Sequence, residues 1–510
     1  MAGAPTAGRA VSFGRRIADL AAAHPDAPAL VFAPRQGPER VVSWRELDSL
    51  GNRLARLLAG HGAGAGAVVA VALTNSVEHL AAAIGAWRLG ACVLPLRWDL
   101  PAWERDRLLE VAAPDLVVGD WPLGDRGIPT IPRAAIDDAT DPADPRLPDG
   151  PLPDAVADPA MAIASSGSTG FPKIIVSPGP GVYDAARPAY ATSQQMGAGR
   201  GQVQLVPAPL YHTNGFRIAH GSLHRDELLV LMEHFDAQQA VSLIERHRVT
   251  TTTMAPVMLL RIARLPGVER RDLSSLRSVL QGAASCPPWL VRWWIDRIGP
   301  ERFFVSYGST ERVGVAFLKG TEWLEHPGSV GRGLDTDIRI LDDAGRDLAA
   351  GEIGHVYLRS RDADGPSYRY RGAEPAPTTD DGFTTVGDLG WLDEDGYLYI
   401  ADRRLDLIVT GGVNVYPSEV EAALVEHPGV ADAAVVGVPD EEWGQRLHAV
   451  VEPSDRARAP TDDVLRDHCR ARLAPHKVPK TFEVVDALPR TAAGKLNRSM
   501  LAGERAPDRR

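Results

Sequence analysis

Leucines recur three and four residues apart between Leu47 and Leu58, so that they fall on one face of a helix. Ser43 and Glu46 precede them at the spacing of a capping box, in which a side chain at each position satisfies a backbone N–H of the first turn. The pattern therefore predicts a helix that begins near Trp44.

The next segments alternate between patterns typical of a strand and patterns typical of a helix. The apolar run AVVAVAL, residues 67–73, is typical of a buried strand. A helical pattern follows over residues 77–89 and leads into the apolar run CVLPL, residues 92–96. Strand, helix and strand in short succession predict a parallel sheet covered by helices.

The middle of the chain repeats this theme and the end departs from it. LLVLM, VTTTMAP and LRSVLQGA read as strands, and Ala237 to His247 as a helix. From Asp337 onward, IRILDDAGRDL and GHVYLRS are short strands joined by Asp-Gly-type turns, which indicates an antiparallel region. ADAAVVGVPD and LHAVVEP, with the helical TDDVLRDHCRARL after them, predict a small α+β domain.

Together these segments predict an α/β protein with a large N-terminal domain of doubly wound sheets, a β-rich subdomain, and a small mobile α+β C-terminal domain. ADRRLDL, residues 401–407, is the polar junction. We predict the large domain over residues 1–402, a hinge at 403–406 and the small domain over 407–510.

Composition excludes several classes of function. The chain has 510 residues and a net charge of −11, so no overall positive field gathers nucleic acid or an anionic membrane. Its three cysteines are far apart and form no C-x-x-C, which favours a reducing cytoplasm over a disulfide framework or a zinc site. No run of about 18 apolar residues predicts a membrane span, and the first twenty residues lack the apolar core of a signal peptide.

The segment SSGSTGFPK, Ser165 to Lys173, has the composition of a loop around an anion. Glycines allow successive backbone N–H groups to point inward at a phosphate, hydroxyls add donors, and Lys173 adds a charge. It is not a Walker A loop, because Pro172 and Ile174 flank the lysine. A solvated Gly/Ser turn is the alternative, and the segment alone does not decide between them.

A second motif is SYGSTERVG, Ser306 to Gly314, which follows the strand-like ERFFV. Its residues would lie at the carboxyl end of a strand, where open α/β sheets place their ligands. Thr310 could donate to a phosphate oxygen, and Glu311 could hold Mg²⁺ together with phosphates. For this motif by itself, a turn with a solvated glutamate is the better explanation.

Two further motifs lie towards the C-terminus. In TTVGDLG, Asp388 stands between glycine-containing turns and could accept hydrogen bonds from the hydroxyls of a ribose, with Arg403 beside the same sugar or a phosphate. In PRTAAGKLNR, Lys495 follows a flexible Ala-Ala-Gly and could reach a distant site. An Asp turn, a linker salt bridge and a solvated lysine are the alternatives.

In this order and spacing the four motifs resemble the adenylate-forming superfamily, and the resemblance covers nearly the whole chain. PAPLYHTNGF, EWLEHPGSVGRG, TGGVNVYPSEVE and HKVPKTFEVVDALPRTAAGK add to it. QGAASCPPWL followed by YGSTE is most similar to the acyl-CoA synthetase branch that includes bile-acid and related acid CoA ligases.

The resemblance implies ATP and Mg²⁺ as cofactors, a carboxylic acid as substrate, and CoA as the co-substrate. The catalytic residues would be Lys495, Thr310, Glu311 and His212. The residues that bind the nucleotide would be Ser165, Ser166, Gly167, Ser168, Thr169, Gly170, Lys173, Tyr307, Gly308, Ser309, Asp388 and Arg403. Glu311 would be the Mg²⁺ ligand, Tyr307 would stack near the adenine, and Lys495 would bridge the substrate carboxylate and the α-phosphate.

The substrate and its acceptor are less closely defined. YHTNGF lacks the aspartate that anchors an amino acid in peptide-synthetase domains, so a neutral organic acid is predicted, in a pocket lined by Tyr211, His212, Phe216, Gly282, Ala283 and Ala284. The small residues among these could equally serve tight strand packing. Gly411 and Gly412 would form the loop that approaches the CoA thiol after the small domain rotates.

Two alternatives to a CoA ligase remain open at this point. Some relatives pass the adenylate to an amine, and Leu405 stands in the hinge where relatives carry Lys or Asp, although Asp406 follows it. A nucleotide-binding protein without activity is the other alternative. Retention of Lys173, Glu311 and their partners in the other motifs argues against it, because a degenerate site has no need of the full set.

Overall fold

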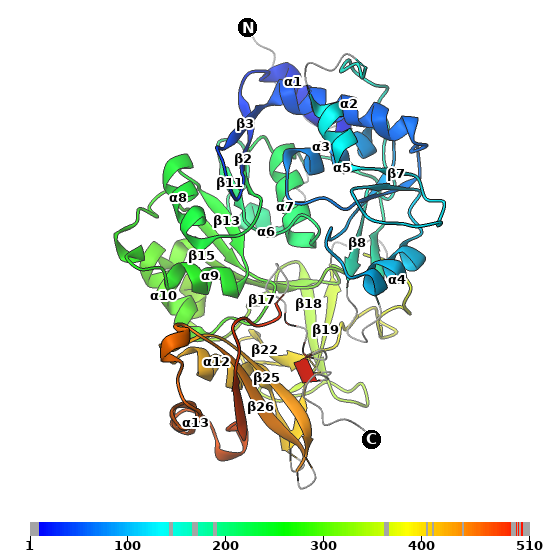
Figure 1. Ribbon diagram of the computed structural model, residues 1–510. Helices are drawn as coiled ribbons and strands as arrows, with labels where there is room; N and C mark the ends of the chain where they lie inside the picture. The colour runs from blue at the N-terminus through cyan, green and yellow to red at the C-terminus, as the bar shows by residue number, and fades with distance from the viewer. Residues whose placement is uncertain are drawn as a thin grey trace.

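The computed structural model describes residues 10–141, 146–165, 172–186, 191–361, 367–403, 406–410, 413–440, 443–490, 496, 498 and 501–502. Three sheets of nine, seven and four strands and one two-stranded pair form the described part of the large domain, and the small domain lies below them in Figure 1. The predicted class is confirmed: the first two sheets are mostly parallel and covered by helices, and the third is antiparallel.

The nine-stranded sheet holds the strands that end at the candidate site. Its order is β17 (Arg332–Gly333), β16 (Val315–Lys319), β15 (Phe303–Gly308), β14 (Ser278–Gln281), β13 (Thr251–Met254), β11 (Val203–Val206), β12 (Leu228–Met232), β2 (Pro28–Ala33) and β3 (Arg40–Ser43). From β15 to β2 neighbouring strands are parallel. The helices α8 (Ala237–His247), α9 (Pro256–Ala263) and α10 (Pro288–Ile298) pack on one face through a core that includes Leu243, Leu259 and Trp294.

The seven-stranded sheet carries the predicted phosphate loop. Its order is β20 (Arg369–Arg371), β9 (Lys173–Ser177), β8 (Met161–Ser165), β5 (Cys92–Pro95), β4 (Val68–Val71), β6 (Leu116–Val118) and β7 (Thr130–Ile131). β4 and β5 pair in parallel, as the predicted strand–helix–strand succession requires, and α3 (Val77–Arg88) joins them.

The other helices of the large domain are α1 (Phe13–Ala23), α2 (Trp44–Gly60), α4 (Ala102–Ala112), α5 (Arg133–Thr140), α6 (Ala191–Gln195), α7 (Thr213–His224) and α11 (Gly320–Glu325). A two-stranded pair joins β1 (Val11–Ser12) and β10 (Val182–Tyr183). α2 begins where predicted, with the Ser43 hydroxyl accepting from the N–H of Glu46 at 3.2 Å. The carboxylate of Glu46 accepts instead from Arg40, so only one half of the predicted capping box forms.

The antiparallel sheet and the small domain complete the fold. β18 (Thr336–Leu341), β19 (Gly354–Ser360), β21 (Asp388–Leu392) and β22 (Leu398–Arg403) form a four-stranded sheet. The small domain contains a hairpin of β23 (Ile408–Thr410) and β24 (Val413–Val415), the sheet β25 (Val430–Asp440), β26 (Gly444–Pro453) and β27 (Thr481–Val484), and the helices α12 (Pro417–Val425) and α13 (Asp462–Arg470).

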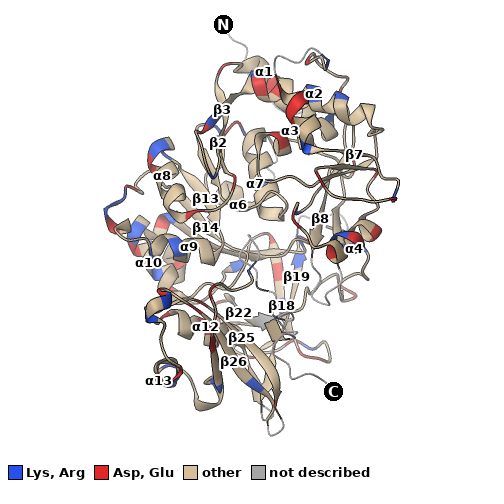
Figure 2. Cartoon of the chain, viewed as in Figure 1, with Lys and Arg blue, Asp and Glu red and all other residues tan. Residues whose placement is uncertain are grey.

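The distribution of charged residues and the character of the helices agree with the two expectations from composition, that the chain has no extended basic surface and no membrane-spanning segment. Figure 2 shows acidic and basic positions interspersed over both domains on the visible face, with no face of one sign. Within the described part of the chain, every helix is too short or too polar to cross a bilayer.

Three histidines are buried in the core between α3 and α7. His220 and His224 pack against the indole of Trp87, and His224 also stacks on the ring of Phe13. His79 is buried with Nδ1 3.2 Å from the carbonyl of Leu73, and both ring nitrogens of His220 lack a hydrogen-bond partner among the described residues. Burial lowers the pKa of His79 to about 4 and that of His224 to about 3, and it lowers the pKa of His220 well below its usual value. All three are therefore neutral in the folded protein at pH 7.

This cluster predicts a loss of stability in mild acid. An unfolded histidine with a pKa near 6.5 binds a proton at pH 5 and the buried one does not, so each histidine lowers the free energy of unfolding by about 2 kcal/mol between pH 7 and pH 5. Urea unfolding at the two pH values measures the loss. His220→Leu is expected to remove about a third of the cluster's contribution, whereas replacement of the exposed His61 by Gln should leave the loss unchanged. An equal loss in wild type and His220→Leu would contradict the assignment.

Candidate functional site

The two ends of the predicted phosphate loop lie opposite each other in a strand pair. Ser165 ends β8 and Lys173 begins β9, and the two residues are partners in the antiparallel register. The ammonium of Lys173 donates to Oε1 of Glu311 at 3.0 Å. This contact brings together the first two sequence motifs, which are 138 residues apart in the chain. Ser166, Gly167, Ser168, Thr169 and Gly170 lie outside the described residues.

A tyrosine that the sequence analysis missed completes this contact. Tyr370 lies on β20, which pairs with β9, and its hydroxyl donates to Oε1 of Glu311 at 2.6 Å. The same hydroxyl accepts from Lys173 at 2.8 Å, and the ammonium lies 4.0 Å from the ring centroid, within cation–π range. The alternation of tyrosine and arginine in YRYR, residues 368–371, is the sequence signal of this strand.

Glu311 is set up as an ionised carboxylate. Burial by itself raises the pKa of Glu311, but the hydrogen bond from Tyr370 and the positive charge of Lys173 outweigh it, and the net pKa is lowered. An ionised oxygen ligand beside a phosphate loop suits Mg²⁺, which binds proteins through one or two carboxylates and takes its other ligands from phosphates and water. Among the described residues, no group of three or more His, Cys, Asp or Glu side chains comes together as a metal site.

The second and third motifs meet at a tyrosine and an aspartate. The hydroxyl of Tyr307, near the end of β15, donates to Oδ2 of Asp388 at 2.6 Å. Asp388 is buried at the start of β21, and its backbone pairs with that of Arg403 on β22. The predicted ribose ligands are thus held on adjacent strands, although the side chain of Arg403 lies outside the described part.

The loop after Tyr307 contacts the first turn of α7. The hydroxyl of Thr213, the first residue of α7, donates to that of Thr310 at 3.2 Å. His212 is the N-cap residue of this helix, whose N-terminal end carries a partial positive charge. Gly308 is exposed, and the buried hydroxyl of Ser309 lacks a partner among the described residues. A phosphate beside Thr310 would therefore face hydroxyl donors and the helix end.

The residues predicted to line the acid pocket fall into two environments. Tyr211 is buried near Trp98, burial raises its pKa to about 12, and its hydroxyl finds no partner among the described residues. Phe216 is instead packed in the core against Trp87 and His220, a position that sequence spacing could not distinguish from the pocket wall.

The three small residues form a turn at the end of β14. Gly282 is buried, and a Cβ there would come within 3.3 Å of the Ser306 hydroxyl on β15, which favours the close packing of these two strands. Ala283 is exposed with φ of +75°, an uncommon conformation for a residue with a side chain, and Ala284 is exposed beside it. Strain of this kind occurs at ligand sites more often than elsewhere.

Four predicted residues of the hinge and small domain cannot be placed. Leu405, Gly411, Gly412 and Lys495 lie outside the described residues, and their roles stay predictions.

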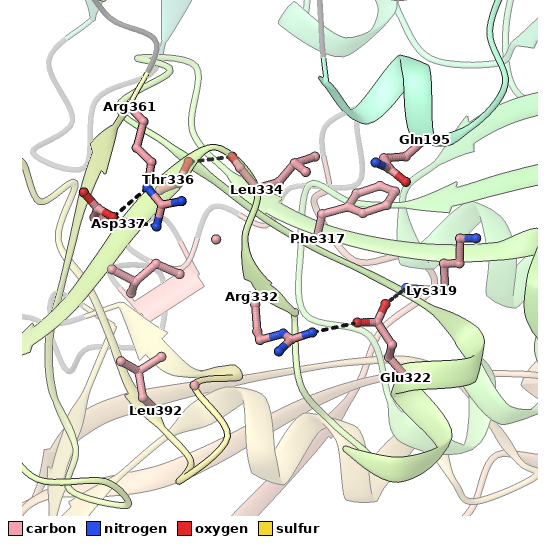
Figure 3. A pocket seen from close by; sticks show the side chains of 13 residues that line it. Gln195, Phe317, Lys319, Glu322, Arg332, Leu334, Thr336, Asp337, Arg361 and Leu392 are labelled. Carbon is pink, nitrogen blue, oxygen red and sulfur yellow. Dashed lines mark hydrogen bonds and ion pairs between the residues drawn. The ribbon is translucent and has the colours of Figure 1, made fainter.

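An open pocket of about 630 Å³ lies between the edge of the nine-stranded sheet and the antiparallel sheet. None of the predicted site residues lines it. Its basic side chains are engaged by acids: Arg332 with Glu322 at 3.6 Å and Arg361 with Asp337 at 2.7 Å (Figure 3). Because Lys173, Glu311 and Asp388 are not among its lining residues, this pocket is not the nucleotide site that the sequence predicts.

Two protein-family models match different regions of this chain. Residues 17–363 match the model of the AMP-binding enzyme family, and residues 419–495 match the AMP-binding enzyme C-terminal domain. The chain belongs to the AMP-binding enzyme family.

Several relatives of this AMP-binding enzyme have curated activities. A 2-succinylbenzoate–CoA ligase of Bacillus licheniformis is 32% identical and aligns over 86% of this chain and 89% of its own length. A feruloyl-CoA synthase of Amycolatopsis is 32% identical over 89% and 92% of the two chains. A fatty acid–[acyl-carrier-protein] ligase of Streptomyces coeruleorubidus, ScoC, is 30% identical over 91% of each. The more specific relation to bile-acid ligases stays a prediction.

Solved structures of acid–CoA synthetases are also similar to this chain. The o-succinylbenzoate CoA synthetase MenE of Bacillus subtilis, in complex with its acyl-adenylate intermediate, has a TM-score of 0.79 at 27% identity and covers 97% of this chain and 98% of its own. The same enzyme in complex with ATP and magnesium ion has a TM-score of 0.79 at 28% identity, with 95% and 98% covered.

Proposed function

We propose that this AMP-binding enzyme joins an organic carboxylic acid to CoA in two steps that consume ATP. In the first step a carboxylate oxygen attacks the α-phosphorus of ATP, forming the acyl adenylate, and pyrophosphate leaves. In the second step the sulfur of CoA attacks the acyl carbon and loses its proton, the thioester forms, and AMP leaves.

The contact between Lys173 and Glu311 carries this proposal. The proposed phosphate-binding residue Lys173 lies beside the carboxylate of Glu311, and Thr310 and the pair Tyr307–Asp388 belong to the motifs that adjoin it. Bound there, Mg²⁺ would neutralise charge on the phosphates during attack. Lys173 and Thr310 would donate to phosphate oxygens, and Asp388 would accept from the ribose.

The roles of the residues beyond the described part rest on the resemblance. We assign Lys495 to the carboxylate and α-phosphate, Arg403 to the ribose, and Gly411 and Gly412 to the approach of the thiol. The large domain is proposed to span residues 1–402 and the small domain 407–510, with the hinge at 403–406. The three cysteines are unpaired, which supports work in the cytoplasm.

The names of the relatives favour a thiol acceptor over an amine. Two relatives act on CoA and one on the thiol-bearing acyl carrier protein, and none of these three names an amide product. CoA is therefore the proposed acceptor, and transfer to an amine becomes an outcome of the test.

The acceptor test uses the whole enzyme with ATP, Mg²⁺ and a panel of aromatic and aliphatic acids. Each acid is incubated with CoA, with a mixture of amino acids, or with neither, and products are read by mass. We expect a thioester only with CoA, and an acyl adenylate with pyrophosphate without any acceptor. An amide formed without CoA, together with no thioester in its presence, would overturn the proposal.

A further inference from the structure

Arg264 of the large domain reaches into the small domain. Arg264 follows the last residue of α9, and its guanidinium donates to three backbone carbonyls across the domain boundary. Nη2 donates to Val425 at 2.7 Å, and Nη1 donates to Ala431 at 2.9 Å and also to Val430. Val425 ends α12, and Val430 and Ala431 begin β25; Figure 1 shows α9 and α10 above α12.

The acceptors suit a cation. Val425 ends α12, and the last carbonyls of a helix have no partner within the helix and carry a partial negative charge. The planar guanidinium presents several N–H donors at once, which an ammonium cannot do with the same geometry. The indole of Trp289 lies 6.0 Å from the Arg264 guanidinium and packs on the large-domain side of the contact.

α12 is held at both of its ends. The hydroxyl of Ser418, near its start, donates to the carbonyl of Ala401 at 2.9 Å, close to the predicted hinge. A helix of nine residues is about 13 Å long, so the Arg264 contact with Val425 lies about this far from the end of α12 that faces the predicted hinge. Ser418 lies closer to the predicted hinge than the carbonyls that Arg264 binds, so a rotation about the hinge would displace those carbonyls more than the Ser418 hydroxyl.

The orientation that Arg264 holds leaves one side of the hairpin of β23 and β24 exposed, while Ile408 and Val415 pack into the core of the small domain. Val409 and Val413, which flank the predicted acceptor loop, are 45% and 43% exposed. Exposed valines on both sides of this loop indicate that the hairpin is not packed on the large domain here.

We propose that Arg264 is a positioning residue that holds the small domain in the orientation preceding acyl transfer. Its release lets the hairpin move towards the adenylate. This inference rests on the proposed function for its kinetic consequence, but the contact and its effect on orientation do not depend on the acid or the acceptor.

The orientation is tested by distance measurement in the full chain. Cys286 is replaced by Ser, and spin labels are placed at the exposed residues Glu269, in the large domain, and Arg458, in the small domain. Double electron–electron resonance measures the distance between the two labels. We expect a narrow distance distribution in the enzyme that retains Arg264 and a clearly broader one in Arg264→Ala. Arg264→Lys, with one charged centre, should lie between them. Arg261→Ala, at an exposed position on the same helix, should match the wild type.

Kinetics test the direction of the effect. The acid-dependent ATP–pyrophosphate exchange rate and the rate of thioester formation from a preformed acyl adenylate are measured separately. For Arg264→Ala we expect the ratio of thioester formation to exchange to rise at least about fivefold, since hydrogen bonds to a charged donor are stronger than neutral ones. Arg261→Ala should leave the ratio unchanged.

The outcomes separate the two proposals. An unchanged distance distribution in Arg264→Ala would overturn the positioning role, and so would a broader distribution with an unchanged or lower ratio. A wild-type enzyme that forms no thioester would overturn the proposed function, while the distance measurement would still decide the role of Arg264.

Discussion

Replacing Glu311 by Gln is expected to reduce acid-dependent ATP–pyrophosphate exchange by about 10² to 10³-fold, the effect typical of losing one group that stabilises charge in a transition state. Glutamine keeps the shape of the side chain and removes its charge. The substitution therefore removes the proposed Mg²⁺ ligand and the ionic partner of Lys173 together. Exchange measured over a series of Mg²⁺ concentrations should show a raised Mg²⁺ requirement as well as a lower maximum.

Two variants control for indirect effects of this substitution. Tyr370→Phe keeps the ring beside Lys173 and removes only the hydroxyl bonded to Glu311, so a smaller loss, about three- to tenfold, is expected. Glu322→Gln changes a carboxylate of the open pocket, bonded to Tyr397 at 3.0 Å, and should leave exchange unchanged. Exchange by Glu311→Gln within twofold of wild type would refute the assignment.

The spacing of apolar residues predicted individual helices and strands well, because each of these elements is set by its own stretch of sequence. The helix predicted for Ala237 to His247 is α8, with the same two ends, and Asp236 caps it through its side chain. The apolar run at 67–73 contains β4, all four residues of which are buried. Fully buried parallel strands read as continuous apolar runs, so burial on both faces made this strand visible in the sequence.

The site was predicted as separate motifs, and only the fold shows how they meet. Tyr370 lies in no motif that the sequence analysis used, and its role depends on β20 pairing with β9, almost 200 residues earlier. The pairing of Tyr307 with Asp388 likewise joins residues 81 apart. No local pattern encodes such contacts, because they depend on how strands of three different sheets are ordered and brought together.

Phe216 illustrates the opposite limit. Its place in an aromatic motif favoured the wall of the acid pocket, but α7 turns this side chain towards α3 and Trp87. An aromatic residue on an amphipathic helix satisfies a core and a pocket equally well by sequence. The direction of its side chain is set by the packing of α7 on the helices around it.

Lys495→Ala is expected to abolish most of the first step and spare the second. The attack of a carboxylate on the α-phosphorus brings two anions together, and a lysine that bridges them lowers this repulsion, so we expect exchange to fall by about 10² to 10³-fold. The second step starts from an acyl adenylate whose carboxylate charge is already gone. Thioester formation from a preformed acyl adenylate and CoA should therefore remain within about threefold of wild type.

The split between the two steps distinguishes this role from a loss of folding, which would lower both rates together. Lys477→Ala provides the matched control, because Lys477 also lies in the small domain and its ammonium is paired with Glu419 at 2.7 Å. It should leave both rates unchanged. Wild-type exchange in Lys495→Ala would show that another cation bridges the carboxylate and the α-phosphate, and Lys173, already beside Glu311, would then be the next residue to replace.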